Sequence, residues 1–153
     1  MQRNKLHEHI ISSAGELFYS QGYNSTGVNE IISKCDIAKA TLYSLFKSIE
    51  DICIAYLNQR HQSFLKSLKD YVNQRGKGRA QLLAIFDLLR DMYLEENFQG
   101  CWALKTLGEL APDQNKILEV IQLQKKELLL YLGEVVGDNI SNLSKAETEK
   151  ISG

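Results

Sequence analysis

Apolar residues recur at three- and four-residue intervals along the first half of the chain, which is the spacing of amphipathic helices. The pattern predicts a first helix that stops at Gly22, a second from Thr26 to about Asp36, and a third from Lys39 to Phe46. Glycine readily adopts a left-handed helix stop, and the Thr26 hydroxyl is expected to cap the second helix. Two short helices joined by a tight turn suggest a helix-turn-helix.

A longer fourth helix is expected next. Ser48, followed three residues later by Asp51, is typical of a capping box at its start, and its apolar positions continue past Val72. Residues 73–79, with the sequence NQRGKGR, contain two glycines and no apolar side chain, which predicts a loop. After this loop we expect helices at 82 to about 97, at 101–110 and at 112–137.

Two features stand out near the C-terminus. The apolar run from Leu128 to Leu132 predicts that the seventh helix is buried on several sides. Ser144 to Glu147 forms another capping box, but the sequence stops at Gly153, and so short a helix is unstable alone. Either the sequence is truncated or a frayed terminus mimics a helix start, and we favour truncation.

The composition is that of a globular helical protein. Of the 153 residues, 44% are hydrophobic, 24% are charged and one is proline, which fits neither a disordered nor a fibrous class. No apolar run is long enough to cross a bilayer, and residues 1–9 lack the apolar core of a signal peptide. We therefore expect a cytoplasmic protein with no membrane partner.

Charge offers only a local argument for nucleic-acid binding. The formal net charge is -1, so the whole molecule has no electrostatic preference for DNA. Residues 37–47 contain two lysines and no acid, which would give a small positive face suited to phosphates.

Enzyme chemistry is not supported by the reactive residues. Cys35, Cys53 and Cys101 lack metal-site spacing, and we interpret them as buried thiols rather than redox sensors. His7 and His9 are two residues apart on a helix and cannot face one site, and no set of nucleophile, base and orienting group can be assembled. We expect no enzymatic activity, no metal site and no cofactor.

Residues 12–52, SSAGELFYSQGYNSTGVNEIISKCDIAKATLYSLFKSIEDI, closely resemble the N-terminal domain of the TetR family of transcriptional repressors. The matching positions are Ala14, Leu17, Phe18, Gly22, Tyr23, Thr26, Val28, Ile31, Ile37, Lys39, Thr41, Leu42, Tyr43, Phe46, Lys47, Glu50 and Asp51. The resemblance implies an all-α fold. In it, a three-helix helix-turn-helix DNA-binding domain at 1–50 is joined by the long fourth helix to a helical ligand-binding and dimerisation domain at 51–153.

The third helix of this family enters the major groove of DNA. The resemblance therefore implies contacts with bases or backbone from Lys39, Ala40, Thr41, Tyr43 and Ser44. It also implies phosphate contacts from Thr26, Gly27, Val28 and Lys47.

Some of these residues have simpler interpretations. The Thr26 hydroxyl is first of all a helix cap, although capping and phosphate binding can coexist. Tyr43 can be partly packed, and we interpret Leu42, Leu45 and Phe46 as core rather than contact.

Four positions depart from the family pattern. Ala38 stands where a serine-like cap is usual, Asp36 and Ala40 stand where glycine is common, and Ile49 stands where a second lysine is frequent. Asp36 can still adopt a left-handed conformation, whereas Ile49 would remove a phosphate contact. These changes are the basis of an alternative function, a TetR-like ligand-binding or interaction module that has lost DNA binding.

Residues 100–113, GCWALKTLGELAPD, are similar to the sixth helix of many members of the family. Family ligands bind among helices four to seven, which implies a pocket lined by Phe64, Phe86, Leu89, Met92, Tyr93, Trp102, Leu107 and Tyr131. A plain hydrophobic core also explains each of these residues individually. As a set they favour an apolar or aromatic inducer.

The resemblance also implies a mechanism. The protein would be a repressor that binds palindromic double-stranded operator DNA as a homodimer and is released when a small-molecule inducer shifts the population of conformations. The two recognition helices must be about 34–36 Å apart to enter successive major grooves. The family dimerises mainly through its last two helices, and this sequence stops at the beginning of the first of them.

Overall fold

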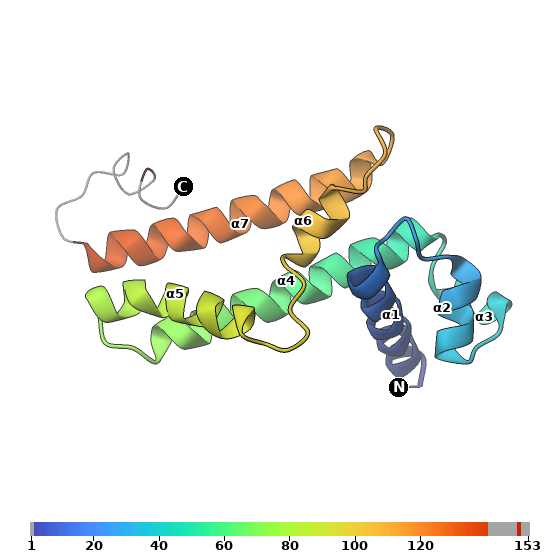
Figure 1. Cartoon of the computed structure of the whole chain (residues 1–153), viewed down its shortest axis with the longest axis horizontal. Coiled ribbons are helices and arrows are strands. Elements are labelled where there is room, and N and C mark those ends of the chain that lie inside the picture. Colours follow the sequence, from blue (N-terminus) through green and yellow to red (C-terminus); the bar gives the residue numbers. More distant parts are fainter. Residues whose placement is uncertain (1, 141–149, 151–153) are drawn as a thin grey trace. The chain divides into compact units, whose positions relative to one another are not determined.

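The computed structural model describes residues 2–140 and Lys150, and the regular secondary structure of these residues is entirely helical (Figure 1). The helices are α1 (Gln2–Gln21), α2 (Val28–Cys35), α3 (Lys39–Leu45), α4 (Ile49–Asn73), α5 (Arg79–Tyr93), α6 (Trp102–Leu107) and α7 (Asn115–Asn139). The expected all-α fold is confirmed. Within the described part of the chain, no helix is both long enough and apolar enough to cross a membrane.

The ends of the first helices follow local signals in the sequence. Gly22 ends α1 with a φ of 101°, a left-handed conformation that favours glycine. Asp36 ends α2 with a φ of 53°, and its amide donates to the carbonyl of Ser33 at 3.3 Å. Ser48 precedes α4, and its Oγ accepts a hydrogen bond from the Asp51 amide at 3.1 Å. The expected stop at Gly22, the left-handed Asp36 and the expected cap at Ser48 are thus all present.

Thr26 does not cap α2, contrary to the prediction. Gly27 is the N-cap residue, and its carbonyl accepts hydrogen bonds from the amides of Glu30 and Ile31, both at 3.2 Å. The buried Thr26 hydroxyl instead donates to the Gly22 carbonyl at 2.7 Å. The prediction failed because the side chain is turned back toward the end of α1, where it satisfies a carbonyl that α1 leaves unpaired.

The start of α7 also differs from the prediction, at Asn115 rather than Pro112. A turn closes ahead of the helix, in which the Ala111 amide donates to the side chain of Gln114 at 2.9 Å and the Gln114 amide donates to the Ala111 carbonyl at 3.0 Å. This turn uses Pro112 as one of its central residues. Pro112 therefore lies before the helix and not in its first turn.

The remaining bounds differ by a few residues. α5 and α6 end earlier than predicted, at Tyr93 and Leu107, whereas α7 continues past Gly137 to Asn139. The expected helix start at 144–147 lies outside the described residues.

The chain forms two compact units. The first unit consists of residues 1–60 and 99–121, and the second of 61–98 with the chain from 122 onward. These units do not coincide with a boundary at residue 50, because α6 and the first turns of α7 join the N-terminal helices. The division into a DNA-binding domain at 1–50 and a ligand-binding domain at 51–153 is a functional one and stays a prediction.

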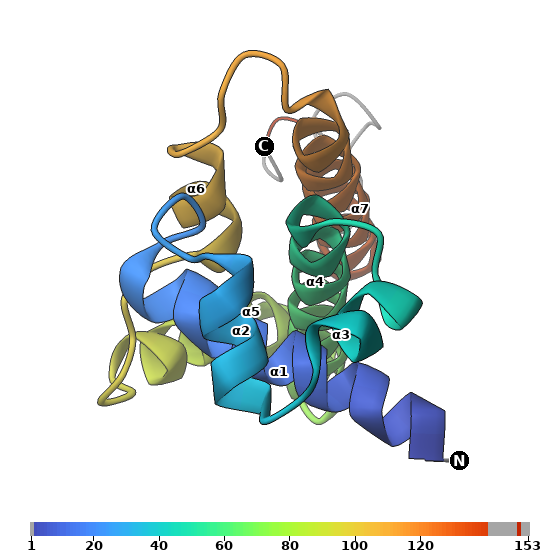
Figure 2. The ribbon, with the colours of Figure 1, turned by 90° about the vertical axis from the view of Figure 1, so that its right-hand side faces the viewer.

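The core of the first unit forms where α1 packs against the start of α4. It includes the fully buried residues Ile10, Ala14, Ile52, Cys53 and Leu57. Figure 2 shows α2 and α3 following one another beside α1 in this unit. Burial of this shared core fixes α1 to the start of α4.

The second unit is built on a separate apolar cluster from α4, α5 and α7, whose buried members are Leu68, Val72, Ala84, Leu88 and Val135. The buried His61 side chain contributes a hydrogen bond between its Nε2 and Glu127 Oε2 at 2.8 Å.

The prediction that residues 128–132 are buried on several sides is wrong for this structure. Leu129 is 46% exposed and Leu130 is 61% exposed. Only one side of this part of α7 faces the cluster of the second unit, through Leu128, Tyr131 and Leu132.

Candidate DNA-binding interface

α3 has one side in the core and one side in solvent. Leu42 and Phe46, which are 1% and 5% exposed, fix its inner side. The exposed side chains are Lys39, Ala40, Tyr43 and Ser44, and Thr41 beside them is half-buried. Residues four apart share a face of a helix, so these positions form one continuous solvent-facing surface. Leu42 and Phe46 are core residues, as the sequence predicted.

The start of α3 is held by backbone alone. The Ala38 carbonyl accepts hydrogen bonds from the amides of Thr41 and Leu42 at 3.0 and 3.2 Å, and no side chain caps the helix. The left-handed Asp36 before it lets the chain reverse between α2 and α3. The departures from the family pattern at these positions therefore leave the tight turn intact.

The start of α2 is the second part of the interface. Gly27 is exposed and Val28 is half-buried, and the first amides of a helix have no acceptor within it. Such amides, at the positive end of the helix dipole, bind phosphate oxygens. Thr26 lies below them with its hydroxyl bonded to Gly22, and it also receives a hydrogen bond from Gln21 Nε2 at 3.4 Å. Direct contact of Thr26 with DNA stays a prediction.

Two exposed lysines provide positive charge here. Lys39 begins α3, and Lys47 lies two residues after its end. Neither forms an ion pair with any described residue. Their charges are thus available to the phosphates of DNA.

Sequence reasoning missed Arg3, a further cation beside α3. Its Nη2 donates to the Ser44 carbonyl at 3.3 Å. The next turn of α1 is attached to the end of α3 through His7, whose ring stacks on that of Phe46 with centroids 4.5 Å apart. The only signal in the sequence was a basic residue in a polar N-terminus, which is too common to single it out.

The expected ligand-binding residues are distributed over both units. In the second unit, Phe64, Met92 and Tyr131 pack against the apolar cluster. α5 carries three further expected residues, which are exposed: Phe86, Leu89 and Tyr93.

The other two expected ligand residues belong to α6 in the first unit. Trp102 is buried at 8% exposure, whereas Leu107 is exposed. The ligand site formed by these eight residues stays a prediction. No group of three or more His, Cys, Asp or Glu side chains suited to a metal ion occurs among the residues that the structure describes.

Comparison with known proteins agrees with the geometry of the first unit. Residues 10–56 match the family model of the bacterial regulatory proteins of the tetR family. A transcriptional activator of Mycolicibacterium smegmatis, FasR, is 30% identical over 105 residues, 65% of this chain and 45% of FasR. The transcriptional repressor NemR of Escherichia coli is 23% identical over 106 residues, 67% of this chain and 53% of NemR. The chain thus matches about half the length of each of these relatives.

The fold extends the likeness beyond the N-terminal helices. The crystal structure of a TetR-family transcriptional regulator from Streptomyces coelicolor superposes with a TM-score of 0.79, at 20% identity, over 88% of this chain and 71% of that one. The exposed α3, its tight turn and these matches define a helix-turn-helix DNA-binding regulator and not an enzyme. Residues 10–56 carry the N-terminal domain of the tetR family of bacterial regulatory proteins, and the fold of the described chain is that of a TetR-family regulator.

Proposed function

We propose that this protein is a cytoplasmic repressor that binds a palindromic operator as a homodimer and is released by a small apolar or aromatic molecule. The observation that carries the proposal is the solvent-facing side of α3, where Lys39, Ala40, Tyr43 and Ser44 are exposed together. A helix of this kind enters the major groove with its N-terminal residues toward the bases.

Each exposed residue has a contact suited to its chemistry. Lys39 and Thr41 at the start of α3 reach base edges, where a lysine prefers guanine and a threonine methyl packs on thymine. The Tyr43 hydroxyl donates to a phosphate oxygen. The amides of Gly27 and Val28, together with Lys47, hold further phosphates and set the register of the helix in the groove.

Homodimerisation follows from the need for two half-sites. Exposed apolar side chains in the second unit support a protein partner there, because isolated monomers rarely leave so many large apolar groups in water. They are Phe86, Leu89, Tyr93, Leu123 and Leu130, with exposures between 47% and 70%. A second copy of the chain is the partner that a palindromic operator requires.

The proposed release by a ligand is also supported by residues of the second unit. Phe64, Met92 and Tyr131 already pack on its apolar cluster without being fully buried. A ligand among them stabilises one arrangement of α4, α5 and α7 over another. The change in DNA affinity is limited by how much more tightly the ligand binds the first arrangement than the second.

The test starts from a pool of random duplex DNA, from which the protein selects the sequences that it binds. Binding to the enriched duplex is then measured by fluorescence anisotropy at several salt concentrations. We expect an enriched palindrome with half-sites about one helical turn apart and a log-log salt slope of about -4 or steeper, since each neutralised phosphate contributes about -0.9. Transcription from a promoter that carries this duplex then decides between repression and activation, the activity for which FasR is named.

A second candidate function is a ligand-binding or interaction module that has lost DNA binding. It is favoured by the absence of a side-chain cap at Ala38 and by Ile49, which cannot bind a phosphate. Selection that enriches no sequence, with equal weak binding to all duplexes, would support this module and overturn the repressor.

A further inference from the structure

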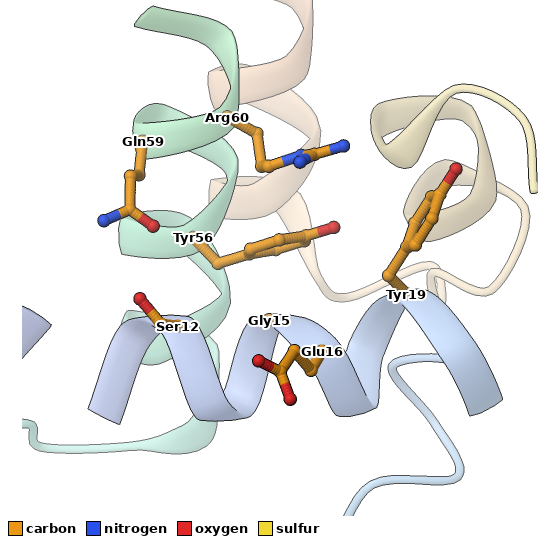
Figure 3. A pocket seen from close by; sticks show the side chains of 7 residues that line it. All are labelled: Ser12, Gly15, Glu16, Tyr19, Tyr56, Gln59 and Arg60. Atoms are coloured by element: carbon orange, nitrogen blue, oxygen red, sulfur yellow. The ribbon is translucent and has the colours of Figure 1, made fainter. Parts of the chain in front are cut away.

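A hollow of about 240 Å³ lies between α1 and α4 within the first unit (Figure 3). Gly15 and Tyr19 line it from α1, and Tyr56 and Arg60 line it from α4. None of these four residues belongs to the DNA interface or to the ligand site described above. The hollow therefore needs an explanation of its own.

The Tyr56 side chain reaches this hollow from a fixed position. Its ring lies across Gly15, where an added Cβ would come within 2.5 Å of Tyr56 Cδ2. The side chain is 4% exposed, yet its hydroxyl forms no hydrogen bond with a described residue. Burial raises the pKa of Tyr56 to about 12, so the hydroxyl is protonated at neutral pH. It is a hydrogen-bond donor without an acceptor among the described residues, and those residues do not enclose it.

Arg60 provides a second donor one turn further along α4. Its guanidinium carbon lies 4.9 Å from the ring centre of Trp102 and 5.6 Å from that of Tyr19. Both rings thus lie within cation–π distance of the guanidinium. Arg60 makes no ion pair or hydrogen bond with the residues that the structure describes. Figure 3 shows the Tyr56 hydroxyl and the Arg60 guanidinium directed toward the same side of the hollow, where Tyr19 lies.

The other charges nearby leave this side positive. Glu16 also lines the hollow, but its carboxylate is paired with Lys34 Nζ at 3.0 Å and turns away from Tyr56 and Arg60 in Figure 3. Lys105 Nζ lies 4.9 Å from the ring centre of Tyr19. An anion that enters beside Arg60 is thus attracted by two cations, while Glu16, the acid among the lining residues, is already paired.

We infer that this hollow binds the carboxylate group of a small organic acid. The Arg60 N–H edge donates to both carboxylate oxygens, which is the geometry that a guanidinium fork favours. The Tyr56 hydroxyl donates a further hydrogen bond, and the ring edge of Tyr19 contacts the apolar part of the ligand. The site is separate from the inducer site proposed for the second unit, and binding to it does not depend on DNA binding.

Trp102 provides a reporter for this site. It is the one tryptophan of the chain, and its ring stacks on the guanidinium that the ligand would engage. The probe is sodium benzoate, added to the full chain at constant ionic strength while Trp102 emission and the melting temperature are followed. We expect a saturable change in emission with a dissociation constant in about the millimolar range, because the site is half-open, and a melting temperature that rises with benzoate.

Variants separate recognition from folding. Arg60→Met is expected to abolish the response, Arg60→Lys to weaken affinity about tenfold because a lysine lacks the fork, and Tyr56→Phe to weaken it several-fold while the ring is retained. Arg75→Met is the matched control, because Arg75 lies 5.8 Å from the ring centre of Tyr71 outside the hollow. Circular dichroism establishes that each variant keeps its helicity.

The possible results of these measurements either support or overturn the carboxylate site. A saturable response to benzoate that is lost in Arg60→Met and kept in Arg75→Met supports the site. No response up to about 50 mM, some fifty times the expected dissociation constant, overturns it. A response in Arg60→Met equal to that of the wild type would also overturn the site. An equal response to the neutral analogue benzyl alcohol would do the same. A response to inorganic phosphate but not to benzoate overturns the assignment to an organic acid.

Discussion

The Glu109 carboxylate accepts a hydrogen bond from the backbone amide of Asn24 at 2.8 Å, and the Asn24 side chain donates back to the Glu109 carbonyl at 2.6 Å. This reciprocal pair attaches the residues just after α6 to the loop between α1 and α2. The first unit therefore depends on a contact between residues 85 positions apart in the sequence. It explains why α6 belongs with the N-terminal helices.

Glu109→Ala should loosen this attachment. The Asn24 amide would lose its acceptor, and we expect faster hydrogen exchange at that amide with a fall in the free energy of unfolding of about 1 kcal/mol, because Glu109 is only half-buried. Exchange followed by NMR and urea denaturation measure the two effects. Glu119→Ala, at an exposed position, is the control. Unchanged exchange at Asn24 would mean that the pair is not formed in solution.

Gly15→Ala tests the close approach of α1 to the Tyr56 ring. The added methyl would lie 2.5 Å from Tyr56 Cδ2, so the ring must move. We expect a net loss of about 1–2 kcal/mol in urea denaturation, since overpacking costs about 1–3 kcal/mol and the gain in helix propensity returns up to about 1.

Two controls accompany this variant. Gly76→Ala meets no atom within 4 Å and should leave stability nearly unchanged. In a Tyr56→Ala background the ring is absent, so Gly15→Ala should become neutral or stabilising. A loss of the same size in both backgrounds would show that the ring is not responsible.

Tyr43→Ala tests the recognition face of α3. Tyr43 is 46% exposed and supports little of the core, so helicity by circular dichroism should be unchanged. We expect affinity for the selected operator to fall about tenfold, the effect of losing about 1.4 kcal/mol of contact. Anisotropy titration measures it. Wild-type affinity in a folded Tyr43→Ala protein would remove this residue from the interface.

Lys47→Ala tests a phosphate contact instead of a base contact. We expect weaker binding to all duplexes alike and a log-log salt slope smaller by about 1. Lys66→Ala is the matched control, because Lys66 is exposed and pairs with Asp70 in the second unit. Equal slopes for the two variants would place Lys47 away from the phosphates.

Alkaline pH should destabilise the protein through its buried thiol. Burial raises the pKa of Cys53 from about 9 to about 12. The unfolded chain therefore releases this proton at lower pH than the folded one. The stabilising contribution is complete below pH 9 and is lost as pH rises toward 12.

Urea denaturation between pH 7 and 10.5 measures this loss, and Cys53→Ala should reduce its slope with pH. At pH 8, iodoacetamide should modify the half-buried Cys101 well before Cys53, as peptide mass spectrometry can establish. Equal modification of both thiols in the folded protein would contradict the assigned burial.

The fold of the first three helices could be predicted because its signals are local. Gly22 and Asp36 adopt left-handed conformations that few other residues tolerate, and the Ser48 hydroxyl reaches an amide three residues away. These interactions need no knowledge of distant parts of the chain. The exposed side of α3 followed from the same periodicity, since Leu42 and Phe46 must face the core.

Distant pairings could not be predicted in this way. Thr26 has the right chemistry for a cap, but its direction is set by packing against the end of α1. The apolar residues of α5 and α7 were recognised as apolar, whereas their burial or exposure depends on which helices cover them. Phe86 and Leu130 are therefore exposed although periodicity suggested pocket or core.

The sequence by itself determined the all-α class, the helix-turn-helix and the identity of its solvent-facing residues, because turn conformations and helical periodicity act within a few residues. Only the tertiary structure decided that Glu109 joins Asn24, that Tyr56 lies on Gly15, and that Arg60 stacks on Trp102. These contacts join residues that are 41 or more positions apart, with no periodic relation between them. Their formation depends on the three-dimensional packing of complete helices, which no local pattern encodes.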